Sequence, residues 1–423
     1  MKKPVFVLIF IFFLFNLITA QNSNDSTLIN REEALDIYIS CDYCDQDYFK
    51  ENFTIINYVR DRKVADVQII ISEMETGSGG TEYMLQFIGL KQFQSLTDTV
   101  LFNLPADYTE EEERVAQLKH IQLGLVPYIL KTPFANKLQL TINAAAESVE
   151  ENDPWKNWVF EISGFGSADS EKSYKNLNLG SEISIQKITD DIKFESAFYS
   201  SYTENKIREY KDDSLVSSTN IYRRNYYFSN LFTKSIGEHW GIGGYLNFQN
   251  STYGNLDIKI SVQPAIEYNA FKYKHASSKQ LRFLYSIGYE YFNYTDTTIF
   301  DKLKDRLFEQ NLSIMLKFIV PWGSIESSIY GSNYLHDFSL FNLGIYLGSD
   351  IRLFKGLSFD LYGGFNMPRN QIALRKGEVT KEDIFVKKHE METDYNFWFH
   401  FGLSYTFGSI YNNVVNPRFD WHF

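Results

Sequence analysis

The segment from Phe341 to Phe365 constrains the fold of this chain more than any other, because its residues alternate in polarity along its length. One set of alternate positions is apolar: Phe341, Leu343, Ile345, Leu347, Ile351 and Leu353. The positions between them are polar or small: Asn342, Gly344, Tyr346, Gly348, Asp350 and Arg352. A period of two residues is that of a β-strand, not a helix. The alternation resumes after Lys355-Gly356, so the segment predicts a β-hairpin with one apolar face and one polar face.

The same alternation recurs through the C-terminal part of the chain and predicts about twelve strands. They are Trp158–Phe165, Asn176–Ile188, Ile192–Tyr202, Ile221–Thr233, Trp240–Gln249, Leu256–Tyr268, Leu281–Phe292, Phe308–Val320, Ile325–Asn333, Phe341–Leu353, Leu357–Phe365 and Phe397–Phe407. Aromatic residues make up 17% of the chain, which suits strands and membrane interfaces. The mean hydropathy is −0.28, and beyond the N-terminus no uncharged apolar run reaches the roughly 18 residues of a membrane helix. A helical membrane protein is therefore excluded.

An even number of strands favours a bacterial outer-membrane β-barrel. The longest predicted connections, Thr203–Asn220 and Asn366–Tyr395, alternate with short turns such as Lys355-Gly356, as external loops alternate with periplasmic turns. We therefore expect a mainly β fold: a transmembrane antiparallel β-barrel of about twelve strands, preceded by a small α+β domain. A soluble sandwich that buries the apolar faces is the alternative. Pro264 lacks an N–H and predicts a bulge or bend within its strand.

The N-terminal part predicts an export signal and a separate domain. Residues 1–20 carry Lys2, Lys3 and an apolar core, as a cleaved secretory signal does, and an uncleaved anchor is the alternative. Residues 21–30 are a predicted flexible lead-in, residues 31–143 an α+β domain, residues 144–156 a linker and residues 157–423 the barrel. The predicted elements of the first domain are strands at 34–40, 65–72, 82–90 and 98–104, and helices at 45–61 and from Thr109 to near Pro133.

Two resemblances support this organisation. The segment CDYCDQDYFKENFTIINYVRDRKVADVQIIISEMETGSGG, followed by EYMLQFIGL and a helix, resembles the front module of an uncharacterised family of exported two-part outer-membrane β-barrel proteins. The order ADVQIII, Gly-rich turn, EYMLQFIGL, DTVLFNLP and helix is similar in topology to the N-terminal α/β domain of TolB-like proteins. These resemblances imply a periplasmic domain in front of a barrel, and they carry over no catalytic residue.

Charge and chain ends bear on the expected partners. The net charge is −12, and it becomes −14 when Lys2 and Lys3 leave with the signal, which argues against nucleic acid as a partner. The aromatic last strand and Phe423 resemble the signal that barrel-assembly machinery recognises. We expect outer-membrane lipid and that machinery as partners, and a periplasmic protein or peptidoglycan as the partner of the first domain.

Candidate catalytic and ligand-binding motifs are few. Cys41 and Cys44 form a CxxC pair before a predicted helix, which fits a redox site or a local disulfide. Two cysteines without a nearby histidine fall short of a closed tetrahedral metal site, and Gly77–Gly80 joins two strands rather than opening a helix, unlike a phosphate-binding loop. A hydrolase would draw on His336 or His400, but no spaced nucleophile motif accompanies them. We expect no catalytic residue, metal or cofactor.

The polar faces of the predicted strands would line the barrel lumen. The charged or titratable residues that we expect there are Glu182, Glu195, Asp257, Lys259, Glu267, Arg282, Glu290, Lys317, Asp350, Arg352, Asp360 and His400. The excess of acidic groups favours a cation-selective pore. Pairing of these charges across a narrow lumen would instead close it. The sequence thus predicts a pore or an envelope scaffold, with a surface adhesin or receptor that uses the long loops as the alternative and a membrane hydrolase as a further one.

Overall fold

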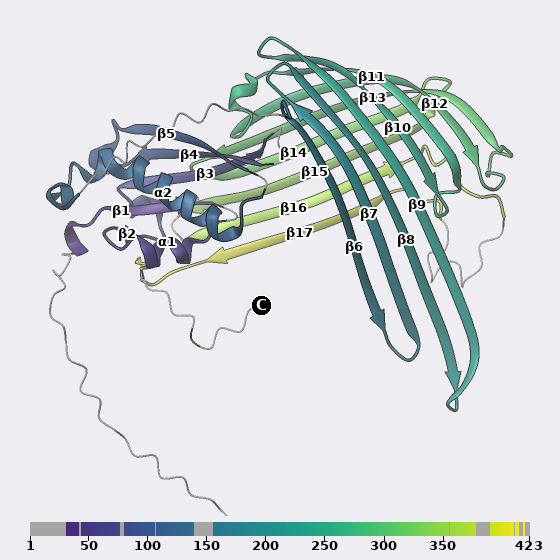
Figure 1. The fold of residues 1–423 in the computed structure, drawn as a ribbon, viewed down its shortest axis with the longest axis horizontal. Coiled ribbons are helices and arrows are strands. Elements are labelled where there is room, and N and C mark those ends of the chain that lie inside the picture. Colours follow the sequence, from purple (N-terminus) through teal and green to yellow (C-terminus); the bar gives the residue numbers. More distant parts are fainter. Residues whose placement is uncertain are drawn as a thin grey trace, which may run out of the picture.

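The computed structural model describes residues 31–41, 44–76, 80–105, 107–138, 155–354, 356–377, 390–409, 411–413 and 418, and it contains two β-sheets (Figure 1). The predicted signal, the lead-in, Gly77–Gly79, most of the predicted linker and Phe423 lie outside the described residues. No helix among the described residues is long and apolar enough to cross a membrane.

The larger sheet contains twelve antiparallel strands, which confirms the predicted strand number. In chain order they are β6 (Trp158–Ser170), β7 (Tyr174–Ile188), β8 (Ile192–Lys211), β9 (Ser214–Ile236), β10 (Trp240–Ser251), β11 (Leu256–Asn269), β12 (Lys279–Tyr294), β13 (Lys304–Val320), β14 (Gly323–Tyr334), β15 (Asp337–Phe354), β16 (Leu357–Pro368) and β17 (Asn396–Tyr405). Each strand pairs with its neighbours in sequence, so β6 and β17 are the two edges, and no pairing between these edges is present among the described residues. The sheet is strongly twisted, and β6–β9 run across the direction of β14–β17 (Figure 1).

The two faces of this sheet differ as the alternation predicts. Large apolar side chains are exposed on one side, which we call the outer face; they include Ile162, Ile183, Phe198, Phe232, Ile242, Val262, Ile287, Phe308, Ile329, Ile345, Phe399, Phe401 and Leu403. The opposite, inner face carries the polar series. A cavity of about 650 Å³ on this face is lined by side chains from β7 through β13, so the inner face is concave there.

Several expectations about connections and register are wrong. Thr203–Asn220 is not a loop: β8 and β9 pair from Lys211↔Ser214 onward, and only Asp212 and Asp213 form the turn. The connection 270–278 is longer than the alternation of loop lengths predicts. Pro264 causes no bulge. It pairs with Gly244 on β10, and the pairing of β11 with β12 keeps the same register before and after Pro264. The bulge in β11 lies between Leu256 and Ile258 instead.

The smaller sheet has the order β2-β1-β3-β4-β5. Its strands are β1 (Asp36–Ser40), β2 (Asn57–Tyr58), β3 (Val67–Glu75), β4 (Thr81–Gly89) and β5 (Thr97–Leu104). Strands β2, β1 and β3 run parallel, whereas β3, β4 and β5 are antiparallel. Helix α2 (Glu110–Ile129) packs on one face, where Ile121, Leu125 and Tyr128 are buried. Gly124 permits this close approach, because a Cβ there would lie 2.1 Å from the ring of Phe87.

The first helix, α1 (Gln46–Asn52), is much shorter than the predicted span 45–61. Its apolar spacing is helical, but the chain turns at Phe53 and continues into the short strand β2. Strand pairing explains the difference, because the backbone of Asn57 and Tyr58 pairs with the edge of β1. Ile56, Asn57 and Tyr58 are buried there. Tertiary strand pairing has overridden the local periodicity.

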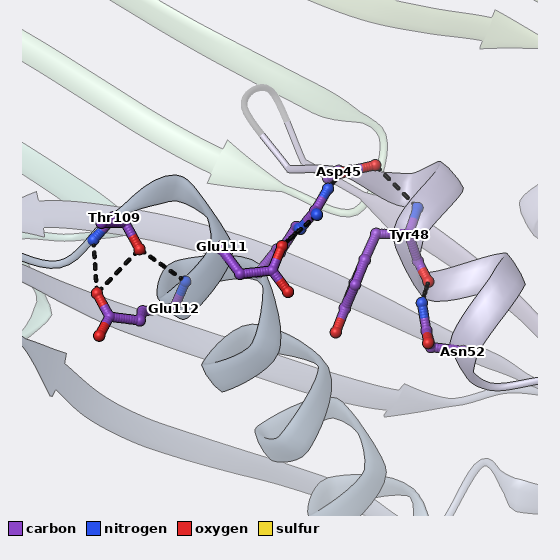
Figure 2. Close-up of polar contacts among 7 residues, drawn as sticks. Asp45, Tyr48, Asn52, Thr109, Glu111 and Glu112 are labelled. Atoms are coloured by element: carbon purple, nitrogen blue, oxygen red, sulfur yellow. Dashed lines mark hydrogen bonds and ion pairs between the residues drawn. The ribbon is translucent and has the colours of Figure 1, made fainter. Parts of the chain in front are cut away.

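Capping side chains fix the beginnings of both helices (Figure 2). Asp45 accepts a hydrogen bond from the backbone N–H of Tyr48 at the start of α1. Thr109 and Glu112 form a reciprocal capping box at the start of α2. Hydrogen bonds from Thr109 lower the pKa of the Glu112 carboxyl, so this cap persists at neutral pH.

Loss of the Thr109 cap should weaken the small-sheet domain. We expect Thr109→Ala to lower its free energy of unfolding by about 1 kcal/mol, since an N-cap hydroxyl satisfies an otherwise unpaired helix N–H. Urea unfolding of the full chain in detergent, followed by helix circular dichroism, measures this change. Glu112→Gln keeps a capping acceptor and should have a smaller effect; equal losses in both variants would contradict the assignment.

Candidate functional site

The helix-free face of the small sheet packs against the large sheet. Along β3, Val67 and Ile69 point to the helix side, whereas Gln68, Ile70 and Ser72 point away from it. Gln68 has no exposed surface and Ser72 is 5% exposed. Both faces of β3 are therefore covered, the second by the large sheet.

Contacts to the ends of large-sheet strands hold this face in place. The Gln68 side-chain amide donates to the carbonyl oxygen of Pro321 at 3.0 Å, in the turn between β13 and β14. The Arg352 guanidinium lies 4.3 Å from the ring centre of Tyr38 on β1. Ser277, in the connection between β11 and β12, contacts Met84 on β4. We call this end of the large sheet the turn end and the opposite end the loop end.

The chain after β17 also reaches the small sheet. Val59 and Tyr411 form an isolated antiparallel bridge. The backbone N–H of Asn412 donates to the Tyr58 carbonyl oxygen at 2.8 Å, and the Asn413 side-chain oxygen accepts from the Tyr58 N–H at 2.7 Å. Segments more than 350 residues apart in sequence are thus joined by backbone hydrogen bonds.

A cavity of about 580 Å³ lies at this junction between the two sheets. Its lining combines Ser72, Glu73, Tyr83 and the cysteine pair of the small-sheet domain with inner-face residues Lys317, Glu326, Asp350, Arg352 and Asp360. Burial raises the pKa of Tyr83, as does the hydrogen bond that its hydroxyl donates to Glu113 at 2.7 Å. The Tyr83 hydroxyl therefore stays protonated at neutral pH, and the charged groups of the cavity are carboxylates, a lysine and an arginine.

The predicted lumen residues fall into separate groups. Lys317, Asp350, Arg352 and Asp360 meet at the junction cavity. Glu182 and Glu195 line the cavity on the inner face of β7–β13. Lys259 and Glu290 line a smaller cavity together with Glu309, which was not predicted. Glu267 and Arg282 lie near the turn end, where Tyr273 donates a hydrogen bond to Glu267 at 2.8 Å.

Asp257 is placed differently from the rest of the predicted set. The bulge leaves Asp257 and Ile258 opposite the single residue Asn293. Asp257 is exposed and accepts a hydrogen bond from the Asn293 side chain at 2.7 Å. Its side chain therefore lies on the side of Ile258, away from Lys259. Leu256, expected to face outward, is instead 8% exposed within an inner cluster.

Three pairs of inner-face charges join adjacent strands. Lys259 lies 3.0 Å from Glu290, Arg282 lies 3.7 Å from Glu267, and His400 lies 3.6 Å from Asp360. A further pair, Lys193 with Glu195, lies within β8. These pairs follow the surface of the sheet rather than spanning the interior, so pairing by itself does not fill the concave side.

The two cysteines and the candidate histidines have distinct environments. Cys41 and Cys44 form a disulfide next to the junction cavity, and the Gln46 side chain lies 3.5 Å from the Cys41 sulfur. His336 lies in the turn between β14 and β15, whereas His400 lies on β17. The structure does not bring these two histidines together.

An apolar cluster covers the inner face at the loop end. It contains Leu256, Phe292, Tyr294, Leu307, Tyr334 and Ile372. The segment 369–377 supplies Ile372 and is anchored by Asn255, whose side chain donates to the Ala373 carbonyl oxygen at 2.9 Å. Thr298 and Arg375 form a β-bridge in the same region. This part of the predicted external loop Asn366–Tyr395 therefore folds onto the strands.

Sequence reasoning missed the docking residues Tyr38, Gln68 and Ser72. The available signal was the composition of β3, whose sequence VQIIIS is apolar on both faces apart from Gln68 and Ser72. A strand covered on both faces reads as a nearly continuous apolar run. Nothing in the sequence specified which segment would supply the second cover.

Replacing Gln68 should loosen the junction. Gln68→Ala leaves the Pro321 carbonyl without its donor, and an unsatisfied buried partner costs about 1–3 kcal/mol. We expect faster amide hydrogen exchange in β1 and β3, measured by mass spectrometry on the full chain. Gln94→Ala, at an exposed position, is the matched control; unchanged exchange in the Gln68 variant would show that the contact does not hold the domain.

No protein-family model and no curated protein matches this sequence.

Proposed function

We propose that the protein is an outer-membrane β-barrel with a path for small ions through its interior, and that the small-sheet domain lies across one end of this path and limits passage. The observation that carries the proposal is the placement of the helix-free face of the small sheet over the inner face of β13–β16. A domain in this position would control access from the turn end.

The outer face supports membrane insertion. Its exposed aromatic and aliphatic side chains extend from β6 to β17, and Phe401 and Leu403 on the edge strand are 64% and 67% exposed. Monomeric soluble proteins rarely expose apolar patches of this extent. An unpaired strand edge raises the free energy of a sheet in lipid, because its backbone N–H and C=O groups have no water with which to form hydrogen bonds. Pairing of β6 with β17 would remove both edges and close the barrel.

Closure predicts proximity between β6 and β17 in the membrane. Ile162 on β6 and the outward row of β17 share the outer face, so one cysteine pair between position 162 and Phe397, Phe399, Phe401, Leu403 or Tyr405 should form a disulfide. Gel mobility after oxidation of the membrane-inserted protein detects the crosslink. Ile162 paired with inner-face His400 is the negative control. If none of the five outward cysteine pairs forms a disulfide, pairing of β6 with β17 at these positions is contradicted.

The docked domain suits a gate rather than a permanent plug. Its contacts to the strand ends include one hydrogen bond, one cation–π contact and the contact of Met84 with Ser277, and the chain after β17 adds a bridge and two hydrogen bonds, all beside a solvent-accessible cavity. A cation–π contact at an exposed site contributes only about 0.5–1 kcal/mol. Release of the domain would break these contacts, and binding to a periplasmic partner or peptidoglycan could supply the free energy.

A crosslink between the small sheet and the chain after β17 tests the gate. Val59 and Tyr411 are bridge partners, whose Cα separation of about 4.5–5.5 Å permits a disulfide. We expect Val59→Cys/Tyr411→Cys to show an open probability in planar bilayers about tenfold lower when oxidised than when reduced, a difference of about 1.4 kcal/mol. Wild type with and without reductant controls for Cys41–Cys44. Equal open probabilities would refute gating by this domain, and the absence of channels in every sample would refute a pore.

One observation favours a second candidate, a surface adhesin or receptor. The β8–β9 hairpin extends the sheet well beyond its neighbours (Figure 1), and Leu215 and Val216 near its tip are 54% and 59% exposed. Apolar side chains on a projecting hairpin suit contact with a partner. Binding to host or bacterial surfaces that is lost in Leu215→Ser/Val216→Ser, with unchanged conductance, would favour this function.

A further inference from the structure

We infer that the inner face of the large sheet contains a binding site for a monovalent metal cation, formed by Glu290, Glu309 and Ser261. The site itself depends only on the side chains of β11, β12 and β13. Its use as a station for passing ions rests on the proposed function.

Strand pairing brings the three residues together. Ser261 on β11 is the partner of Glu290 on β12. Glu309 on β13 is the partner of Gly288, one inner-face position from Glu290. Gly288 has no side chain, and the Gln263 side chain lies over it and donates to Glu309 at 3.4 Å. Oxygen atoms from three adjacent strands thus border one cavity of about 220 Å³.

Two buried oxygen atoms in this cavity have no hydrogen-bond partner among the residues that the structure describes. Glu290 is 2% exposed; its Oε1 lies 3.0 Å from the Lys259 ammonium, but its Oε2 has no hydrogen-bond partner among the described residues. The Ser261 hydroxyl, on a residue that is 3% exposed, is likewise unpartnered within the described part of the chain. A buried carboxylate oxygen without a partner is costly, so a bound ligand here would be stabilised.

The charge balance of the cavity selects a single positive charge. Glu309 is 8% exposed and has neutral neighbours in Gln263, Asn311 and Ser332. No lysine or arginine in the described residues lies within 4 Å of its carboxylate. When both carboxylates are ionised, they leave one negative charge uncompensated against the one ammonium of Lys259.

The residues around the cavity strengthen its preference for a monovalent cation. Phe292 and Leu307, two residues along their strands from Glu290 and Glu309 toward the loop end, belong to the apolar cluster, and the Lys259 ammonium lies 4.9 Å from the ring centre of Phe292. Apolar neighbours lower the local dielectric and strengthen interactions between charges. Carboxylate, hydroxyl and amide oxygens are the donors that hard cations prefer. The nearby Lys259 disfavours a divalent ion, so Na⁺ or K⁺ fits best.

Thermal unfolding of the full chain in detergent tests the site without reference to conductance. We compare NaCl, KCl, CaCl₂ and N-methylglucamine chloride at one ionic strength, because the last cation is too bulky and weakly coordinating for the site. We expect the unfolding midpoint of wild type to be about 2–4 °C higher in saturating Na⁺ or K⁺ than in N-methylglucamine. The salt that gives the larger shift identifies the ion.

Matched variants assign the shift to this cavity. Glu309→Gln keeps the shape and removes the uncompensated charge, so the cation-dependent shift should disappear. Ser261→Ala keeps the charge and should reduce the shift. Glu182→Gln, on the inner face away from the cavity, should retain it in full. The inference is overturned if wild type shows no difference between salts, if only Ca²⁺ stabilises it, or if Glu309→Gln retains the shift. None of these results depends on whether the barrel conducts.

Discussion

The continuous antiparallel ladder from β6 to β17 is the constraint on which the rest of the structure depends. Once each strand pairs with its sequence neighbour, the alternation of side chains assigns every residue to one of two faces. A shift of one residue in any strand would move its apolar row to the wrong side. The bulge at Leu256 and Ile258 shows the effect locally, because it turns Asp257 away from Lys259.

The ladder also determines where the small-sheet domain can sit. Its helix-free face needs a second cover, and the ends of β13–β16 present a carbonyl at Pro321 and a guanidinium at Arg352. The carbonyl accepts a hydrogen bond from Gln68 and the guanidinium lies over the ring of Tyr38, and both of these residues are buried on that face. The junction cavity lies between these two faces and is lined by polar side chains from both.

The interior combines paired and unpaired charges in a consistent way. Lys259–Glu290 and Arg282–Glu267 pair across adjacent strands, where the geometry of the ladder places them. Glu309 is different, because its strand neighbours are Gly288 and Tyr334 and no lysine or arginine of the described residues lies within 4 Å of its carboxylate. Part of the acidic excess noted in the sequence is thus concentrated at a buried position, where Glu290 and Glu309 share one cavity with Lys259. This concentration is what makes a specific cation site a reasonable inference.

The sequence by itself determined the strands and their two faces, because side-chain polarity with period two is a local property. It placed Lys317, Asp350, Arg352 and Asp360 on one face, and the structure brings these four to the junction cavity; it also specified α2 through its cap at Thr109. Only the tertiary structure decided that α1 ends at Asn52, because pairing of Asn57 and Tyr58 with β1 outweighs helical spacing. It alone showed that Thr203–Asn220 continues the ladder, that the segment 369–377 folds onto the loop end, that Gln68 contacts Pro321, and that Glu309 lines an inner-face cavity. These features depend on contacts between segments distant in sequence, and local periodicity carries no information about such contacts.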